Sequence, residues 1–270
     1  MFIYGFSKPE DVTAFLSSKI KAKLRQYPSL LCGVYVKHNC GCDNSVVNIN
    51  GDSIFPAASL IKIPVAVILL KKIDNGEISW DDTLTLKQNH YAFGTGYLRT
   101  KKAGTKIKLR EVFKLMLTIS DNTACNMIID FLGGIQTVNQ EISKLGLKNT
   151  KINNLLGDFK GTNKTSPRDL VTILEKSLEG NLLSSQSRKL FKYTLLHVSN
   201  KSLINKGLGR YTRFAHKTGT IGICIGDCGI IYFPFGKRIK IAVIVKRPFN
   251  SLQGKEILKE IGKLIYEYLG

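Results

Sequence analysis

The sequence contains no apolar run of the length that a membrane-spanning helix needs, which excludes a protein anchored by such a helix within these residues. Its first stretch, MFIYGFSKPEDVTAFLSSKIKAK, also lacks the basic head and the continuous hydrophobic segment of a signal peptide. Internal repeats and low-complexity tracts are absent too. Either the protein stays in the cytoplasm, or the chain has lost an export signal. The apolar content of 43% is ordinary for a soluble globular protein.

Acidic residues are scarce: 20 Asp and Glu stand against 40 Lys and Arg, which gives a net charge of +20. No acidic residue occurs between Glu179 and Asp227, a window that holds eight basic ones. A face of one sign attracts anionic partners, for example an anionic cell-wall polymer or a carboxylate-bearing substrate. A merely solvated basic surface fits this window best of all. Nucleic acid is disfavoured, because few aromatic residues interleave with the basic ones and no recognition motif is present.

The six cysteines show no metal-binding pattern, since neither Cys40-Gly-Cys42 nor Cys224-x-x-x-Cys228 has a familiar zinc spacing. Cys224 and Cys228 are four residues apart on an expected strand, too far along it to pair with each other. We therefore expect buried thiols, no metal and no cofactor.

Hydrophobic periodicity predicts helices at both ends of the chain and in its middle, with strands between them. A helix begins at Pro9, and another covers 251–269. Strands are expected at 30–38 and 45–51, joined by the turn-rich NCGCDN, and again near the C-terminus at 212–220, 223–233 and 238–247. The middle of the chain is mostly helical, at 59–72, 109–118, 122–132, 135–145, 167–178 and 186–196.

This order of elements predicts a single α/β domain over residues 1–270, an α+β sandwich. Both chain ends would build one five-stranded antiparallel sheet, covered on one face by the terminal helices. Residues 1–58 and 200–270 would form this α/β lobe, and residues 59–199 an inserted all-helical lobe. Small-molecule sites tend to form in the cleft between two such lobes.

The run FPAASLIKIPV places Ser59 and Lys62 among apolar residues, where an amine is costly to ionise. Three residues apart on a helix, the two side chains share a face. A serine at a helix start lies near the positive end of the dipole, and a buried, neutral amine can take its proton. A second Ser-x-x-Lys, at Ser18 and Lys21, has no such apolar surroundings and indicates a solvated helix face.

Two further motifs follow in the chain: Ser120-Asp121-Asn122 between two helical segments, and Lys217-Thr218-Gly219-Thr220 on an expected strand. Alone, the first could be a helix cap and the second a strand end with a glycine. Together and in this order, the three motifs are the signature of class A β-lactamases and penicillin-binding proteins. The chain resembles that family from about Ser29 to its last helix, and GTGYLRTKKAGTKIKLRE resembles the penicillin-binding proteins closest to class A.

The resemblance implies a β-lactamase/transpeptidase-like fold and assigns the catalytic roles. Ser59 resembles the acylated nucleophile and Lys62 its proton acceptor. Ser120 resembles the hydroxyl that relays a proton to the leaving amine, and Asn122 the amide that holds the substrate's side-chain carbonyl. Lys217 resembles the residue that supplies positive charge.

The resemblance also assigns the binding groups. Thr218 and Thr220, on either side of Gly219, resemble the hydroxyls that bind the substrate carboxylate. The backbone N–H groups of Ser59 and Thr220 resemble the oxyanion hole, with donors aimed at charge that develops in the transition state. The reaction that the resemblance implies is attack on an amide carbonyl beside a carboxylate-bearing group. Both the D-alanyl-D-alanine end of a peptidoglycan stem peptide and a β-lactam ring fit that description.

The sequence departs from the class A pattern at the glutamate that activates the deacylating water. Leu156 stands where that glutamate is expected, in a loop that is several residues short. The only carboxylate between Gly146 and Pro167 is Asp158, which is left as an alternative base.

An arginine that many class A enzymes carry on the next strand is missing too. The matching stretch is Gly226-Asp227-Cys228, so Arg210 or Arg213 would have to supply that charge, if any residue does.

The sequence thus predicts a penicillin-binding serine acyltransferase of DD-peptidase type that acylates at Ser59 and deacylates β-lactams slowly. The alternatives are a class A-like β-lactamase that uses Asp158, a non-enzymatic β-lactam sensor domain, and a degenerate relative that only binds. The substrates of this family lie outside the cytoplasmic membrane, which favours an exported protein whose signal has been removed.

Overall fold

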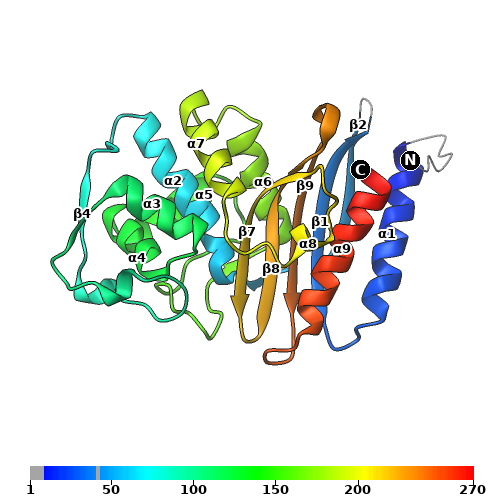
Figure 1. Cartoon of the computed structure of the whole chain (residues 1–270), viewed down its shortest axis with the longest axis horizontal. Helices are drawn as coiled ribbons and strands as arrows, with labels where there is room; N and C mark the ends of the chain where they lie inside the picture. Colours follow the sequence, from blue (N-terminus) through cyan, green and yellow to red (C-terminus); the bar gives the residue numbers. More distant parts are fainter. Residues whose placement is uncertain (1–8, 41–42) are drawn as a thin grey trace.

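The computed structural model describes residues 9–40 and 43–270 and is built around one five-stranded antiparallel sheet (Figure 1). The two chain ends supply its strands, in the order β2 (Asp43–Ile49), β1 (Leu31–Cys40), β9 (Arg238–Lys246), β8 (Cys224–Tyr232) and β7 (Arg213–Ile221). The mixed fold with this sheet and an inserted helical segment is the predicted one, so the fold-class prediction is confirmed.

The two terminal helices, α1 (Pro9–Arg25) and α9 (Gln253–Leu269), lie side by side on one face of the sheet (Figure 1). Leu16 and Ile20 of α1 and Ile257 and Ile261 of α9 are buried there against side chains of the strands. In contrast, Ser18 and Lys21 are exposed on α1. The second Ser-x-x-Lys motif is therefore a solvated helix face, as predicted.

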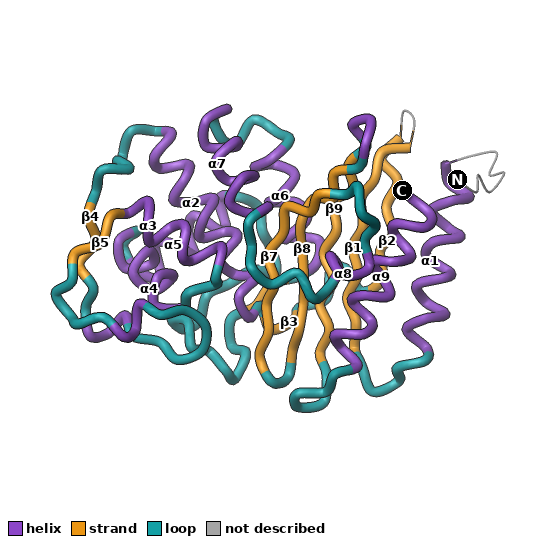
Figure 2. The backbone as a smooth tube through the Cα atoms, in the orientation of Figure 1, coloured by secondary structure: helices purple, strands orange, loops and turns teal. Residues whose placement is uncertain are grey.

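The middle of the chain forms six helices of the expected lengths, five of them within one residue of their predicted bounds. Figure 2 shows this helical segment beside the sheet. The helices are α2 (Lys62–Asp74), α3 (Leu109–Thr118), α4 (Asn122–Phe131), α5 (Gly134–Lys144), α6 (Pro167–Leu178) and α7 (Ser185–Leu196). The division into two lobes with boundaries near residues 58 and 200 stays a prediction.

Helix α2 is the centre of the helical segment, and its first nine residues, 62–70, are all buried. A helix that is buried all round needs neighbours on every side, and α2 packs against α3, α4, α5 and α6. Helix α6 in turn packs against β1 and β9 and joins the helices to the sheet. The turn that leads into α2, Ala58–Ile61, packs against strand β7.

Short elements escaped prediction. They are the two-stranded pairs β3 (Phe55–Pro56) with β6 (Lys164–Thr165) and β4 (Thr83–Thr85) with β5 (Lys106–Lys108), and the four-residue helix α8 (Ile204–Gly207). The turn predicted at NCGCDN includes Gly41 and Cys42, which lie outside the described residues.

The thiols of Cys32, Cys125, Cys224 and Cys228 are buried and free, which confirms the expectation for these four. Within residues 9–40 and 43–270, no cluster of three or more His, Cys, Asp or Glu side chains could hold a metal ion. No helix in the same ranges is both long and apolar enough to cross a membrane.

Candidate active site

Ser59 lies in a single 3₁₀ turn, Ala58–Ile61, that leads directly into α2. Ala58, the residue before it, has a positive φ of 45°, an unfavourable conformation for a residue with a Cβ. The neighbours of Ser59, namely Ala58, Leu60 and Ile61, are buried, whereas Ser59 itself is half-buried and lines a cleft. The strained turn thus presents the hydroxyl of Ser59 at the surface of an otherwise apolar segment.

Lys62 is the fully buried lysine that the apolar run predicted. Its Nζ donates to Ser59 Oγ at 3.2 Å, to Ser120 Oγ at 3.1 Å and to Asn122 Oδ1 at 2.7 Å. Burial lowers the pKa of Lys62 to about 8. The amine is therefore neutral in about a tenth of the molecules at pH 7, far more than for an ordinary lysine, and it lies within reach of the serine's proton.

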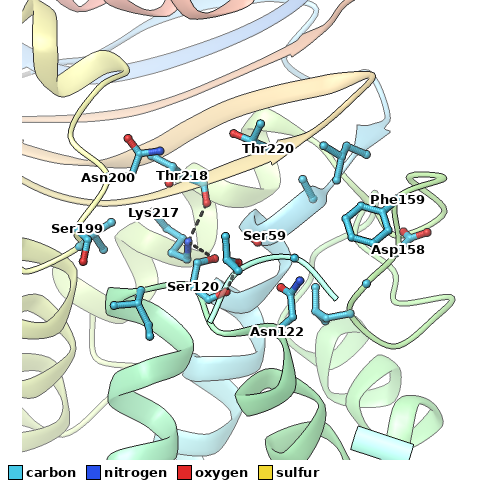
Figure 3. A pocket seen from close by; sticks show the side chains of 18 of the residues that line it. Ser59, Ser120, Asn122, Asp158, Phe159, Ser199, Asn200, Lys217, Thr218 and Thr220 are labelled. Carbon is cyan, nitrogen blue, oxygen red and sulfur yellow. Dashed lines mark hydrogen bonds between the residues drawn. The ribbon is translucent and has the colours of Figure 1, made fainter. Parts of the chain in front are cut away.

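Ser120 connects the two lysines of the site. Its Oγ accepts hydrogen bonds from Lys62 and, at 2.9 Å, from Lys217 Nζ (Figure 3). The backbone of Ser120 has a φ of 60°, again in the left-handed region. Two serines and two lysines thus form one continuous hydrogen-bonded chain, through which a proton could pass from Ser59 to the cleft.

The rest of the Ser-Asp-Asn motif explains how this chain is held. Asp121 does cap helix α4, since its Oδ1 accepts from Ala124 N at 2.9 Å. Its Oδ2 accepts from the backbone N–H groups of Tyr97 and Leu98, at 2.7 and 2.9 Å. The capping interpretation is therefore right for Asp121, and the same residue also fixes the loop that forms one wall of the cleft.

Lys217 is fully buried in β7, where its Nζ also donates to the Thr218 carbonyl at 2.8 Å. Burial, followed by repulsion from Lys62, lowers the pKa of Lys217 to about 7. The adjacent Gly219 is required by close packing. A Cβ there would lie 2.9 Å from the Leu60 side chain and 3.1 Å from the backbone nitrogen of Ser59.

The motif residues surround one cleft with a cavity volume of about 260 Å³ (Figure 3). Its lining comes from 58–59, 94–95, 118–120, 122, 156–159, 163, 198–200, 217–218 and 220–221. Ser59, Ser120, Asn122, Thr218 and Thr220 all line it. The structure therefore brings together the nucleophile, the relay and the binding residues that the sequence suggested from segments far apart in the chain.

The loop that should carry a glutamate presents Leu156 instead, buried at 7% exposure and lining the cleft. Asn126 fixes the backbone of Leu156, accepting from its N at 2.7 Å and donating to its carbonyl at 3.2 Å. Asp158 also lines the cleft, but both of its oxygens accept bonds inside the loop, from Thr162 Oγ1 at 2.8 Å and Asn163 N at 2.7 Å.

Asp227 lies opposite Thr218 in the β7–β8 ladder and is completely buried. Its Oδ1 is 2.8 Å from His216 Nδ1, and its Oδ2 accepts from Ile204 N at 3.2 Å. Burial raises the pKa of this carboxyl. The Asp227 carboxyl is therefore engaged by His216 and the backbone of Ile204, and it does not line the cleft.

Neither of the two arginines that the sequence suggested as a source of positive charge lines the cleft. Arg210 and Arg213 are exposed, and neither lines the cleft. Ser199 and Asn200, which do line it, carry no sequence signal, because they belong to an irregular segment between α7 and α8.

Similarity to known proteins identifies the family of this chain. The sequence model of the family described as "Beta-lactamase enzyme family" matches residues 15–269. The solved structure of PBP-A is 40% identical in sequence, covers 94% of this chain and 96% of its own, and superposes with a TM-score of 0.91. A leucine-to-glutamate mutant of PBP-A, solved as an acyl-enzyme complex with penicillin G, is 39% identical over 95% of this chain and 96% of its own, with a TM-score of 0.92.

A curated relative, a β-lactamase of Bacteroides uniformis, is 26% identical over 232 residues, which are 79% of this chain and 78% of the relative. The family match spans almost the whole chain. The chain therefore belongs to the β-lactamase enzyme family and is a class A β-lactamase-like serine enzyme.

Proposed function

We propose that the protein is a penicillin-binding acyltransferase of DD-peptidase type, which forms an acyl-enzyme at Ser59 and releases β-lactam acyl groups slowly. The observation that carries the proposal is the hydrogen-bonded chain of Ser59, Lys62, Ser120 and Lys217, beside a loop that presents Leu156 in place of a base. The first feature supports acylation, and the second supports slow hydrolysis of the product.

Acylation begins when the neutral amine of Lys62 takes the proton of Ser59 Oγ, 3.2 Å away. The serine oxygen then attacks the amide carbonyl of the substrate. The backbone N–H groups of Ser59 and Thr220 stabilise the resulting oxyanion, a contribution typically worth a hundredfold or more in rate. The proton next passes from Lys62 through Ser120 Oγ to the leaving nitrogen, and the carbon–nitrogen bond breaks.

Asn122 and Lys217 orient the substrate. The amide nitrogen of Asn122 uses one N–H for the Phe93 carbonyl, at 2.8 Å, and has a second N–H for a carbonyl of the substrate's acyl side chain. Lys217 stabilises the relay serine and the developing negative charge. The hydroxyls of Thr218 and Thr220 bind the substrate carboxylate.

The substrate class follows from these groups: an amide or lactam carbonyl beside a carboxylate. The D-alanyl-D-alanine end of a peptidoglycan stem and a penicillin both fit it. That the similar PBP-A, as its leucine-to-glutamate mutant, was solved as an acyl-enzyme with penicillin G supports the same chemistry here. Because peptidoglycan lies outside the cytoplasmic membrane, we also propose that the protein acts there.

A β-lactamase is the second candidate, favoured by the names of the curated relatives and by Asp158, a carboxylate in the lining of the cleft. Against it, Asp158 already accepts two hydrogen bonds within its own loop. Steady hydrolysis of a chromogenic cephalosporin, lost in Asp158→Asn, would favour the lactamase.

Intact-mass spectrometry after addition of penicillin G, followed over time, tests the proposal. We expect one equivalent of adduct to form rapidly and to persist. Ser59→Ala should abolish labelling with an unchanged circular dichroism spectrum, because alanine suits a helical turn. Labelling that persists in Ser59→Ala would place the nucleophile elsewhere.

We propose an anionic cell-wall polymer as a further partner, because basic side chains gather around the ring of Tyr232. Lys192 Nζ lies 3.7 Å from the ring centroid of Tyr232, and Arg238 contacts the same ring. Burial lowers the pKa of Lys192, and the nearby positive charges of Arg238 and Arg213 lower it further. Glu179 neutralises part of this cluster. Co-sedimentation with purified cell wall should fall with added salt and in Arg213→Glu; binding insensitive to both would contradict the proposal.

A further inference from the structure

Positive charge is nearly absent from the surface of the cleft. Among the lining residues in the described part of the chain, Lys217 is the only lysine or arginine. It is fully buried and already donates to Ser120 Oγ and the Thr218 carbonyl. Across the strand ladder from Thr218 stands Asp227, an acid. A substrate carboxylate that enters beside Thr218 therefore meets no exposed cation among the described residues that line the cleft.

Uncharged donors occupy the same wall. Ser199 and Asn200 line the cleft together with Thr218, and Figure 3 shows them on the side formed by β7. Both flanks of this short segment are fixed. Ser199 N donates to the Thr118 carbonyl at 2.9 Å, and Ile204 N donates to Asp227 at 3.2 Å. The segment is thus held in place before any substrate binds.

The amide of Asn200 has a defined orientation. Its Oδ1 accepts from Ser202 N at 3.0 Å and from Ser202 Oγ at 2.8 Å. An amide oxygen that takes two donors fixes which end of the group is the nitrogen, so the NH₂ end points away from Ser202. Its two N–H groups have no hydrogen-bond partner among the residues that the structure describes. The side chain is exposed and lines the cleft.

We propose that Asn200 is a carboxylate-binding residue of this cleft: its NH₂ group donates to the substrate carboxylate that Thr218 also binds, where an arginine would otherwise serve. The inference rests on the proposed function and names a specificity determinant of that site. A hydrogen bond to a charged acceptor is roughly twice as strong as a neutral one, so two neutral donors can hold a carboxylate without a cation. Because no exposed charge takes part, binding through this contact responds weakly to salt.

Asn200→Asp is the sharpest variant. The aspartate keeps an oxygen for both Ser202 bonds, so the turn is retained, while the NH₂ donor becomes a negative oxygen that repels a carboxylate. Asn200→Ala removes the donor without adding charge. The matched control is Asn205→Asp, the same substitution on α8, which does not line the cleft. It reports any effect of one added negative charge at a distance.

The assay compares acylation by penicillin G with acylation by its methyl ester, in which the carboxylate is blocked. Asn200→Ala should slow acylation by the acid about ten- to a hundredfold, the usual range for losing a hydrogen bond to a charged group. Asn200→Asp should slow it further. Both variants should change acylation by the ester about threefold or less, and Asn205→Asp should change neither. Equal losses for acid and ester, or no loss for the acid, would overturn the assignment.

A second arm separates this inference from the proposed function. In a Ser59→Ala background no acyl-enzyme can form at Ser59, and the two compounds are compared by equilibrium binding in an NMR titration. The acid should bind more tightly than the ester, and Asn200→Asp should abolish that preference. If the unaltered protein is never acylated but this preference is found, the proposed reaction fails and the role of Asn200 stands. If the preference is absent in Ser59→Ala, the role of Asn200 is wrong.

Discussion

Replacing Leu156 by glutamate tests whether a missing base is what limits deacylation. The leucine lines the cleft, and its backbone N and carbonyl are both fixed by Asn126, at 2.7 and 3.2 Å. Because these bonds involve only the backbone of residue 156, Leu156→Glu should leave them intact. The new carboxylate would then lie at the cleft surface, in a position to activate a water against the ester of Ser59.

The size of the effect follows from two opposing contributions. A well-placed general base typically accelerates a reaction by about a hundred- to ten-thousandfold. The loop was not shaped around a carboxylate, and Leu156 is only 7% exposed, so part of this gain is lost to imperfect geometry and to burial of an unpaired charge. We expect adduct loss to be about ten- to a hundredfold faster, with acylation changed by less than about threefold. Loss of the buried leucine should also lower the melting temperature.

The measurement is the lifetime of the penicillin G adduct by intact mass, together with the steady rate that follows the burst. Leu156→Gln is the matched control, since glutamine has nearly the same shape and size but cannot act as a base. If Leu156→Gln shortened the lifetime as much as Leu156→Glu, loosening of the loop rather than base catalysis would explain the change. Rapid turnover by the unaltered protein would refute the reasoning altogether.

The two lysines of the site give two further expectations. With the pKa of Lys62 at about 8, its neutral fraction falls about tenfold for each pH unit below that value, so acylation should rise with pH up to about 7, where Lys217, with a pKa of about 7, begins to lose its charge and the profile levels off. A flat stopped-flow profile between about pH 5 and 7 would exclude Lys62 as the base. Lys217→Ala should slow acylation about a hundredfold, because Ser120 and the developing charge lose a nearby cation; an unchanged rate at low salt would contradict that role.

Much of the site could be predicted because its reactive residues lie in three short motifs, and the residues around each motif indicate its burial and its place in a helix or strand. The burial of Lys62 follows from the apolar run around it. Ser18 and Lys21 have the same spacing but are exposed, because they lie on the solvent face of the amphipathic helix α1, whose other face buries Leu16 and Ile20. Helix bounds followed from hydrophobic periodicity. The structure adds the cap of α6, where Ser166 Oγ accepts from Asp169 N at 3.2 Å.

What could not be predicted depends on contacts between distant segments. Ser120 meets Lys62 across 58 residues and Lys217 across 97, so only the folded chain shows that one hydroxyl joins both amines. Asn200 is an ordinary loop residue in the sequence, and its amide orientation arises from the turn it makes with Ser202. The two-residue strands β3 and β6 are too short for any periodicity to reveal.

The low pKa values of the two lysines depend on the kind of acceptor that surrounds them. Lys62 donates to two hydroxyls, the Ser120 carbonyl and the amide oxygen of Asn122, and no carboxylate forms an ion pair with Lys62 or Lys217 within the part of the chain that the structure describes. Neutral acceptors satisfy the N–H donors without favouring the charged form as strongly as a carboxylate would, so burial dominates and lowers the pKa. A lysine paired with a carboxylate would stay protonated and could not accept the proton of Ser59.

Asn122→Asp tests this dependence directly, because the Asn122 Oδ1 that lies 2.7 Å from Lys62 Nζ becomes part of a negative group. The pKa of Lys62 should rise, since an opposite charge at this distance favours the ammonium form. Acylation near neutral pH should fall, and the rising limb of its pH profile should move to higher pH by about one unit or more. Loss of the bond to the Phe93 carbonyl would weaken substrate binding at every pH, but it cannot displace the profile. A uniformly slower reaction with an unshifted profile would show that the neutral acceptors do not set the basicity of Lys62.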